Sequence, residues 1–164
     1  MFYTCNAMKL KKDHLYCLAV FALLALIALV LDALCLELVG EEEKTLIKNV
    51  VSLRHVKNTG AAFSLLRNCP WVASILGALI LATITAFMLF GKMRLAARLS
   101  LSAALSGGAC NLYMRVFRGG VNDWIELGFM RFPLFNFADI CVCVGAALFV
   151  VFYVFSKGND ADAA

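Results

Sequence analysis

The sequence predicts an all-α membrane protein with four transmembrane helices and a small β-containing segment on the outer side of the membrane. Hydrophobic residues make up 63% of the 164 residues, well above the roughly 45–50% apolar share of a soluble globular domain. The mean hydropathy is +0.86, and the charged residues, 16% of the chain, are concentrated in a few short stretches. The apolar runs between them are long enough to cross about 30 Å of hydrocarbon as helices.

The first predicted span comprises residues 15–36. As a helix it is about 33 Å long, which is too long for the apolar core of a signal peptide, so we expect it to be retained. The other predicted spans are residues 71–90, 95–112 and 135–155. The third is rich in Ser, Ala and Gly, which let helix backbones approach closely, and it is predicted to form the centre of the bundle.

The distribution of basic residues predicts the orientation. Three lysines precede the first span, and the short loop at 91–98 holds one lysine and two arginines. Basic residues in short loops favour the cytoplasmic side, so both termini are expected to be cytoplasmic. Residues 37–70 and 113–134 then lie outside, and the β-branched residues of 47–57 predict a short strand or hairpin there. The whole chain, 1–164, is expected to form a single domain.

Several functional classes are disfavoured. The net charge of +4 is explained by topology, and no basic and aromatic surface points to nucleic acid. Seven cysteines, an odd number, imply no disulfide framework, and they and the two histidines lack the spacing of a metal site. No metal or other cofactor is expected.

Two acids next to apolar spans, Asp123 and Asp139, are the main functional candidates. An ionisable residue at such a depth is costly to keep charged and is a functional candidate by default. Two neighbouring carboxyls share one proton, which gives a base that activates water and an acid that protonates a carbonyl. Asp32, at the end of the first span, is predicted to be a structural acid that is hydrogen-bonded to the 107–115 region.

Four segments resemble, in order and spacing, the signatures of the bacterial signal peptidase II family. They are NTGAAFS at 58–64, GGACNLYMR at 107–115, the VNDW turn at 121–124 and FNFAD at 135–139. The resemblance implies a four-helix aspartic endopeptidase of the bacterial inner membrane with its active site on the periplasmic side. Such an enzyme cleaves diacylglyceryl-modified prolipoproteins on the N-terminal side of the lipidated cysteine. The implied partners are this substrate and membrane lipid, and we expect a monomer.

The resemblance also assigns roles to individual residues. Asp123 and Asp139 match the catalytic positions. The positions that match substrate-binding residues are Asn58, Gly60, Asn111, Arg115 and Asn136. The sequence departs from the family pattern at Leu36, Cys110, Met114 and Asn122, where lysine, glycine, aspartate and valine are usual.

Alternatives remain open for the protein and for single residues. A proton-linked transporter also uses intramembrane acids, but it predicts acids spread through the depth of the bilayer. A non-catalytic relative that binds lipoproteins is suggested by Met114 and Cys110. From the residues alone, Asn58 is an N-cap in a turn that Gly60 permits, and Arg115 neutralises headgroup phosphates.

Overall fold

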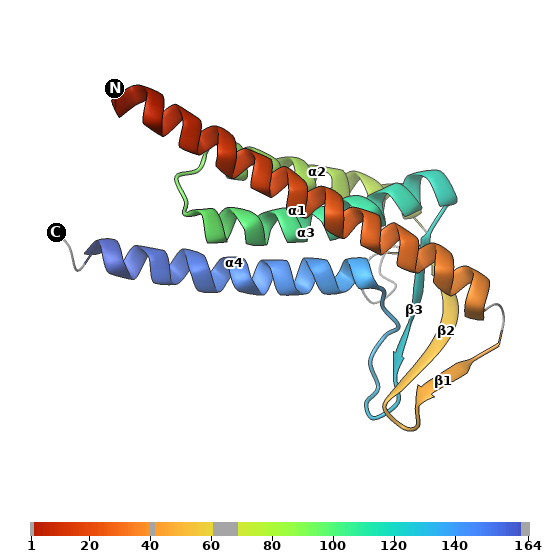
Figure 1. The fold of residues 1–164 in the computed structure, drawn as a ribbon. Coiled ribbons are helices and arrows are strands. Elements are labelled where there is room, and N and C mark those ends of the chain that lie inside the picture. Colours follow the sequence, from red (N-terminus) through yellow and green to blue (C-terminus); the bar gives the residue numbers. More distant parts are fainter. Residues whose placement is uncertain (1, 40–41, 61–68, 162–164) are drawn as a thin grey trace.

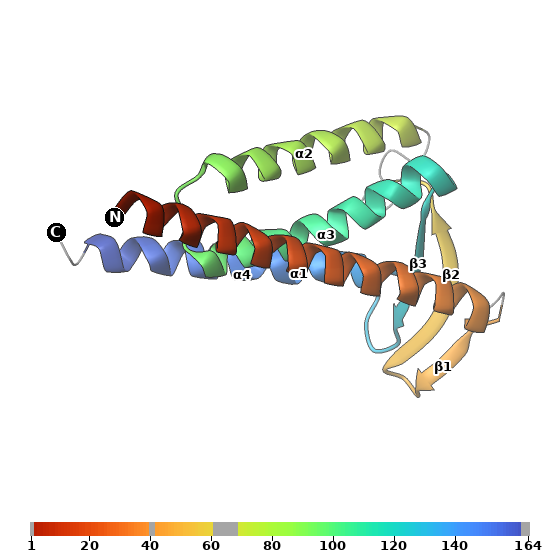
Figure 2. The ribbon, with the colours of Figure 1, turned by 45° about the horizontal axis from the view of Figure 1, so that its top comes forward.

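The computed structural model describes residues 2–39, 42–60 and 69–161, and it arranges four helices beside one another with a small sheet at one end (Figure 1). The elements are α1 (Phe2–Val39), β1 (Lys44–Ile47), β2 (Val51–Asn58), α2 (Pro70–Phe90), α3 (Leu95–Arg118), β3 (Val121–Leu127) and α4 (Phe137–Ala161). The start of α1 and the end of α4 are both at the end opposite the sheet, as two views show (Figures 1 and 2).

Within the described residues, three helices are long and apolar enough to cross a membrane. Their apolar stretches are Lys11–Val39, Trp71–Phe90 and Phe137–Val154. The fourth helix, α3, is 24 residues long, but serines, glycines and basic residues are interspersed among its leucines. The protein therefore has the helical membrane fold that the composition predicts, with one helix less apolar than the others.

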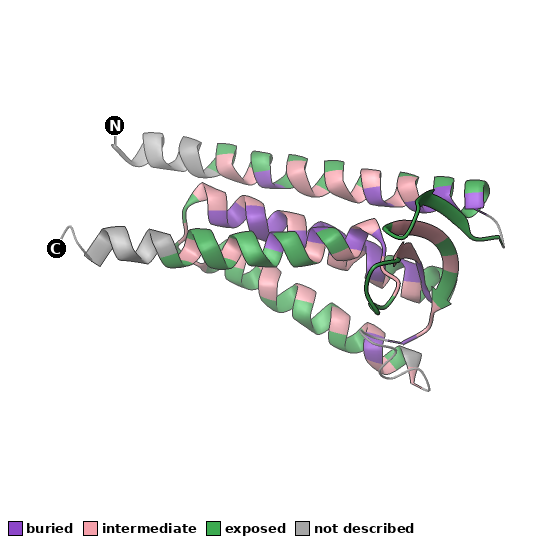
Figure 3. Ribbon diagram, turned by 90° about the horizontal axis from the view of Figure 1, so that it is seen from below, coloured by how far each residue is buried: buried purple, intermediate pink, exposed green. Residues whose placement is uncertain are grey.

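Helix α3 is the centre of the bundle, as predicted. It contacts each of the other three helices, and buried residues occur along it from Ala97 to Met114 (Figure 3, purple). A Cβ atom added at Gly107 would lie 2.1 Å from the Ala138 carbonyl oxygen, so α3 and α4 approach backbone to backbone at this point. Small residues permit this close packing in membrane helices.

The sheet is antiparallel, with strand order β1-β2-β3. The strands predicted within 47–57 are confirmed, whereas the prediction of a turn at 121–124 is wrong because these residues begin β3. This segment has a hydrogen-bonding partner on each edge. Asn58 of β2 is opposite Val121, and Phe135 forms a bridge with Ile125 on the other side. The turn instead lies at Gly119, whose φ of 70° ends α3 in a left-handed C-cap.

The helices extend beyond the predicted spans because helical structure does not stop where the apolar run stops. The first helix runs over Phe2–Val39 rather than 15–36, and α4 covers Phe137–Ala161 rather than 135–155. The largest functional difference is at α3, which was expected to end at 112 and continues to Arg118. This extra length brings basic residues at its end beside the sheet.

Candidate active site

The side chain of Asp123, on β3, is oriented by a residue of the neighbouring antiparallel strand β2. Because Val56 is opposite Asp123, Asn58 lies two residues further along β2 on the same face of the sheet. Its Nδ2 donates a hydrogen bond of 2.9 Å to Asp123 Oδ2. The Asp123 side chain is buried, with 5% of the residue surface exposed. The β2–β3 register thus fixes the direction of this carboxyl.

Asp139 is held in the first turn of α4 by a reciprocal cap. Asn136 Oδ1 accepts a 3.0 Å hydrogen bond from the Asp139 backbone N–H, and Asp139 Oδ2 accepts one of 3.1 Å from the Asn136 backbone N–H. This is the arrangement of a capping box, with Asn136 at the N-cap. The Asn-x-x-Asp spacing is a local signal that the sequence interpretation did not use.

Asn136 connects the two acids. Its buried Nδ2 lies 3.1 Å from Asp123 Oδ1, 3.2 Å from Asn111 Oδ1 and 3.3 Å from the Asn122 carbonyl oxygen. Asn111, on α3, in turn donates a 2.7 Å hydrogen bond to Asp139 Oδ1. Asp123 and Asp139 therefore belong to one hydrogen-bond network, with an oxygen of each carboxyl bonded to the same asparagine.

The environment of Asp123 favours its protonated form. Burial raises the pKa of Asp123 to about 6, and the negative charge of Asp139 acts in the same direction. The hydrogen bonds from Asn58 and Asn136 and the charge of Arg115 oppose this shift in the pKa. Such a carboxyl keeps its proton to a higher pH than an ordinary aspartic acid does, and it can give this proton to an adjacent oxygen.

Gly60 and Arg115 complete the arrangement. Arg115 Nε donates a 3.3 Å hydrogen bond to the Gly60 carbonyl oxygen, which ties α3 to the end of β2. The Gly60 N–H donates to Asn58 Oδ1 at 3.0 Å, so Asn58 forms an Asx turn at the end of the strand. Every residue predicted for the site thus joins one connected group. The remainder of the NTGAAFS segment, residues 61–64, lies outside the described residues.

Asp32 is structural in its contacts, but its predicted partners are wrong. It is 1% exposed, and Oδ2 accepts hydrogen bonds from Arg118 Nη1 at 2.6 Å and from Asn122 Nδ2 at 3.4 Å. The 107–115 region supplies neither bond. The reason is the length of α3, because its additional turns carry Arg118 to Asp32.

Asn122 and His55 are polar residues near the site to which the sequence interpretation assigned no role. The His55 Nε2 lies 3.1 Å from Asn122 Oδ1, and the other end of the Asn122 amide bonds Asp32. Successive residues of a strand face opposite sides, so Asn122 is directed away from the face that carries Asp123. Recognition of VNDWIEL as a strand would have predicted this division.

We expect Arg118→Met to lower thermal stability because it leaves the buried Asp32 carboxylate without its cation. Leaving a buried carboxylate unpaired is expected to lower the free energy of unfolding by about 2 kcal/mol or more. Arg54→Met is the matched control, since Arg54 forms a more exposed 3.4 Å salt bridge with Glu126 that should contribute less than about 1 kcal/mol. Thermal unfolding in detergent micelles compares the two variants, and equal midpoints would contradict a structural role for the Asp32–Arg118 pair.

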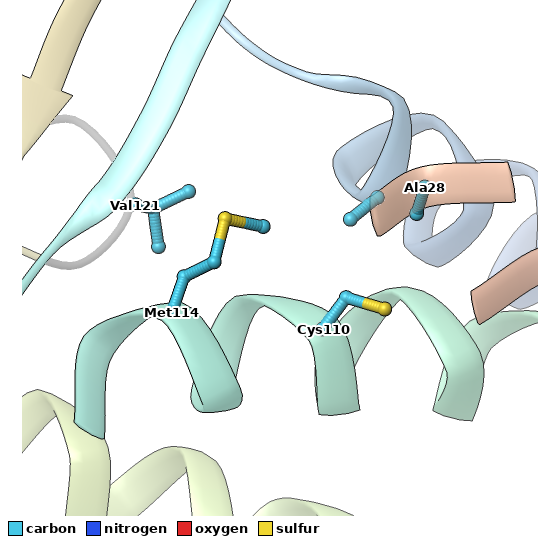
Figure 4. Packing of buried hydrophobic residues seen from close by; sticks show 5 residues of the cluster. Ala28, Cys110, Met114 and Val121 are labelled. Carbon is cyan, nitrogen blue, oxygen red and sulfur yellow. The ribbon is translucent and has the colours of Figure 1, made fainter. Parts of the chain in front are cut away.

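Two departures from the family pattern, Cys110 and Met114, form part of the hydrophobic core beneath β3. Met114 is 1% exposed and extends from α3 toward Val121, while Cys110 lies nearer to Ala28 of α1 (Figure 4). Ala138, at the start of α4, belongs to the same cluster. These side chains pack α1, α3, α4 and β3 together.

The comparisons with known proteins agree with one another. Residues 20–155 match the profile of a family described as "Signal peptidase (SPase) II". A lipoprotein signal peptidase of Clostridium acetobutylicum is 38% identical over 113 residues, covering 66% of this chain and 73% of the relative. One of Streptococcus pyogenes is 31% identical over 141 residues, covering 85% and 93%. A solved bacterial membrane enzyme superposes with a TM-score of 0.74 at 22% identity, over 85% of this chain and 90% of that one, so the fold is shared.

Proposed function

This chain belongs to the signal peptidase II family, and we propose that it is an aspartic endopeptidase that matures prolipoproteins. It cleaves the signal peptide from diacylglyceryl-modified precursors on the N-terminal side of the lipidated cysteine. The observation that carries this proposal is the bonding of both carboxyls, Asp123 and Asp139, to Asn136. Two acids in one network have the chemistry that water-mediated peptide hydrolysis requires.

In the proposed reaction the two acids have different roles. Asp139 acts as the base, because the first turn of a helix favours a negative side chain, and it takes a proton from the attacking water. The water oxygen bonds to the scissile carbonyl carbon while Asp123 gives its proton to the carbonyl oxygen. Collapse of the tetrahedral intermediate breaks the C–N bond, and the proton on Asp139 passes to the leaving amine. Asp123 recovers its proton from the intermediate, so the pair returns to its initial state.

The surrounding polar residues are proposed to hold the substrate. Asn58, Gly60, Asn111, Arg115 and Asn136 supply hydrogen-bonding groups around the acids, which fix a peptide where the bilayer excludes water. An apolar hollow of about 190 Å³ adjoins the start of α4, with Phe137, Ile140 and Val144 in its lining. Acyl chains that remain in the leaflet anchor the substrate there, each buried CH₂ contributing about 0.8 kcal/mol.

The proposed placement is the bacterial inner membrane, with all four helices spanning it and both termini in the cytoplasm. The sheet and the acids then lie at the periplasmic surface, where a lipidated precursor emerges. Helix α3 crosses as the central span, where its contacts with the other three helices shield its polar residues from lipid. The chain acts as one domain and as a monomer.

The direct test is incubation of the full chain in micelles with a diacylglyceryl-modified prolipoprotein and, in parallel, with the same precursor lacking the lipid. We expect release of the signal peptide from the lipidated precursor and much slower release from the other, detected as a gel shift. Binding of the lipidated precursor without cleavage would overturn the proposal in favour of a non-catalytic lipoprotein-binding protein.

The state of Asp123 predicts the pH dependence of the reaction. Since burial raises the pKa of this acid to about 6, its protonated fraction falls as the pH rises above that value. We expect kcat/KM to decline above about pH 6, approaching tenfold per pH unit, because the acid must hold its proton in the free enzyme. Initial rates measured from pH 5 to 9 on one lipopeptide test this, and values that rise between pH 6 and 8 would contradict it.

A further inference from the structure

A second site lies away from the acids, toward the end of the bundle opposite the sheet. An apolar groove of about 310 Å³ runs between α1, α2 and α3. Its lining includes His14 and Phe21 from α1, Thr85 and Met88 from α2, and Ser102 and Leu105 from α3. It shares no residue with the polar network around Asp123 and Asp139.

A buried cation, Arg98, lies next to His14, which lines this groove. Arg98 is only 7% exposed, and its Nη1 lies 3.1 Å from His14 Nε2, while its Nη2 donates to the Gly91 carbonyl oxygen at 3.3 Å. Among the described side chains, none of its hydrogen bonds or ion pairs involves a carboxylate, and its buried Nε–H has no partner. A buried charge without a counter-charge is costly, so this guanidinium is suited to an anion.

The position of the groove along the membrane normal matches that of a lipid molecule in one leaflet. His14 lies three residues after the start of the apolar stretch Lys11–Val39, which places it at the edge of the hydrocarbon in the proposed orientation. From there the lining on α1 continues to Phe21, about 10 Å deeper at 1.5 Å per residue. The polar end therefore lies at headgroup depth and the apolar part at acyl-chain depth.

We propose that this site binds an anionic phospholipid of the cytoplasmic leaflet, with its phosphate at Arg98 and His14 and one acyl chain in the groove. Basic pockets between transmembrane helices are suited to anionic headgroups. Lys11 and Lys12, on the preceding turn of α1, are exposed and do not line the groove. The inference uses the proposed membrane orientation but does not depend on peptidase activity.

Native mass spectrometry of the full chain, titrated with phosphatidylglycerol or phosphatidylcholine of identical acyl chains, tests the site. We expect the wild type to retain phosphatidylglycerol about fivefold or more tightly, the scale of one basic side chain at an anionic headgroup. Arg98→Gln should abolish this preference. Thr85→Phe, which fills the groove without changing the charge, should weaken retention of phosphatidylglycerol. Lys12→Gln is the matched exposed-cation control and should leave the preference unchanged.

Other outcomes would overturn the proposal. One is equal retention of the two lipids by the wild type, and another is an equal loss of preference in Lys12→Gln, which would indicate general surface charge. Displacement of phosphatidylglycerol by millimolar inorganic phosphate with no effect of Thr85→Phe would indicate an anion site without an acyl groove. If Arg98→Gln does not fold, His14→Gln removes the other headgroup contact and must also lower the preference. Cleavage of a lipopeptide, measured on each variant, separates this result from failure of the proposed peptidase function.

Discussion

Replacing either Asp123 or Asp139 by asparagine is expected to reduce the rate of prolipoprotein cleavage by at least about 100-fold. Asparagine preserves the shape of the side chain but can neither take a proton from water nor give one to the scissile carbonyl. Because the two acids act as a unit, the double variant should lose about as much activity as each single variant. The rate is measured as release of the signal peptide from a diacylglyceryl-modified precursor in micelles.

Glu126→Gln is the matched control for these variants. Glu126 is on the same strand as Asp123, but its carboxylate pairs with Arg54 at the surface of the sheet. The Glu126→Gln variant should cleave the precursor at the wild-type rate. Each variant is checked for folding by circular dichroism and by its thermal midpoint. Wild-type activity in folded Asp123→Asn or Asp139→Asn would refute the aspartic mechanism, even though membership of the family would stand.

Asn136→Ala is expected to lower kcat about 100-fold, on the scale of removing one preorganised hydrogen-bond donor. Truncation removes the side-chain link between the two acids and leaves the carbonyl oxygens of Asn111 and Asn122 without this donor. It also removes the N-cap of α4. The thermal midpoint should fall as well, because buried groups left unpaired cost about 1–3 kcal/mol each.

A second buried asparagine, Asn122, separates the loss of kcat from the loss of stability. Asn122→Ala also removes a buried amide, but that side chain bonds Asp32 and His55 rather than Asp123 or Asp139. The variants are therefore expected to lose comparable stability, with a much larger loss of kcat in Asn136→Ala. An equal loss of kcat in both would show that Asn136 serves the fold alone.

Prediction from the sequence succeeded for features that a single segment determines. It failed for features that depend on contacts between distant segments. The apolar runs identified the helices because a helix satisfies its backbone within one segment. VNDW was interpreted as a turn, since four residues do not reveal that β2 on one edge and Phe135 on the other make them a strand. The partner of Asp32 was missed for a related reason, because α3 continues beyond its apolar run to Arg118.

The sequence by itself determined that this is a helical membrane protein, because the length of an apolar run is a property of a single segment. It also carries four short segments that resemble the signatures of the signal peptidase II family. Only the tertiary structure decided which polar groups meet. Asn58 and Asp123 are 65 residues apart and Asn111 and Asp139 are 28 apart, yet each pair is hydrogen-bonded. Such contacts depend on strand register and on the close packing of α3 against α4, which no single segment encodes.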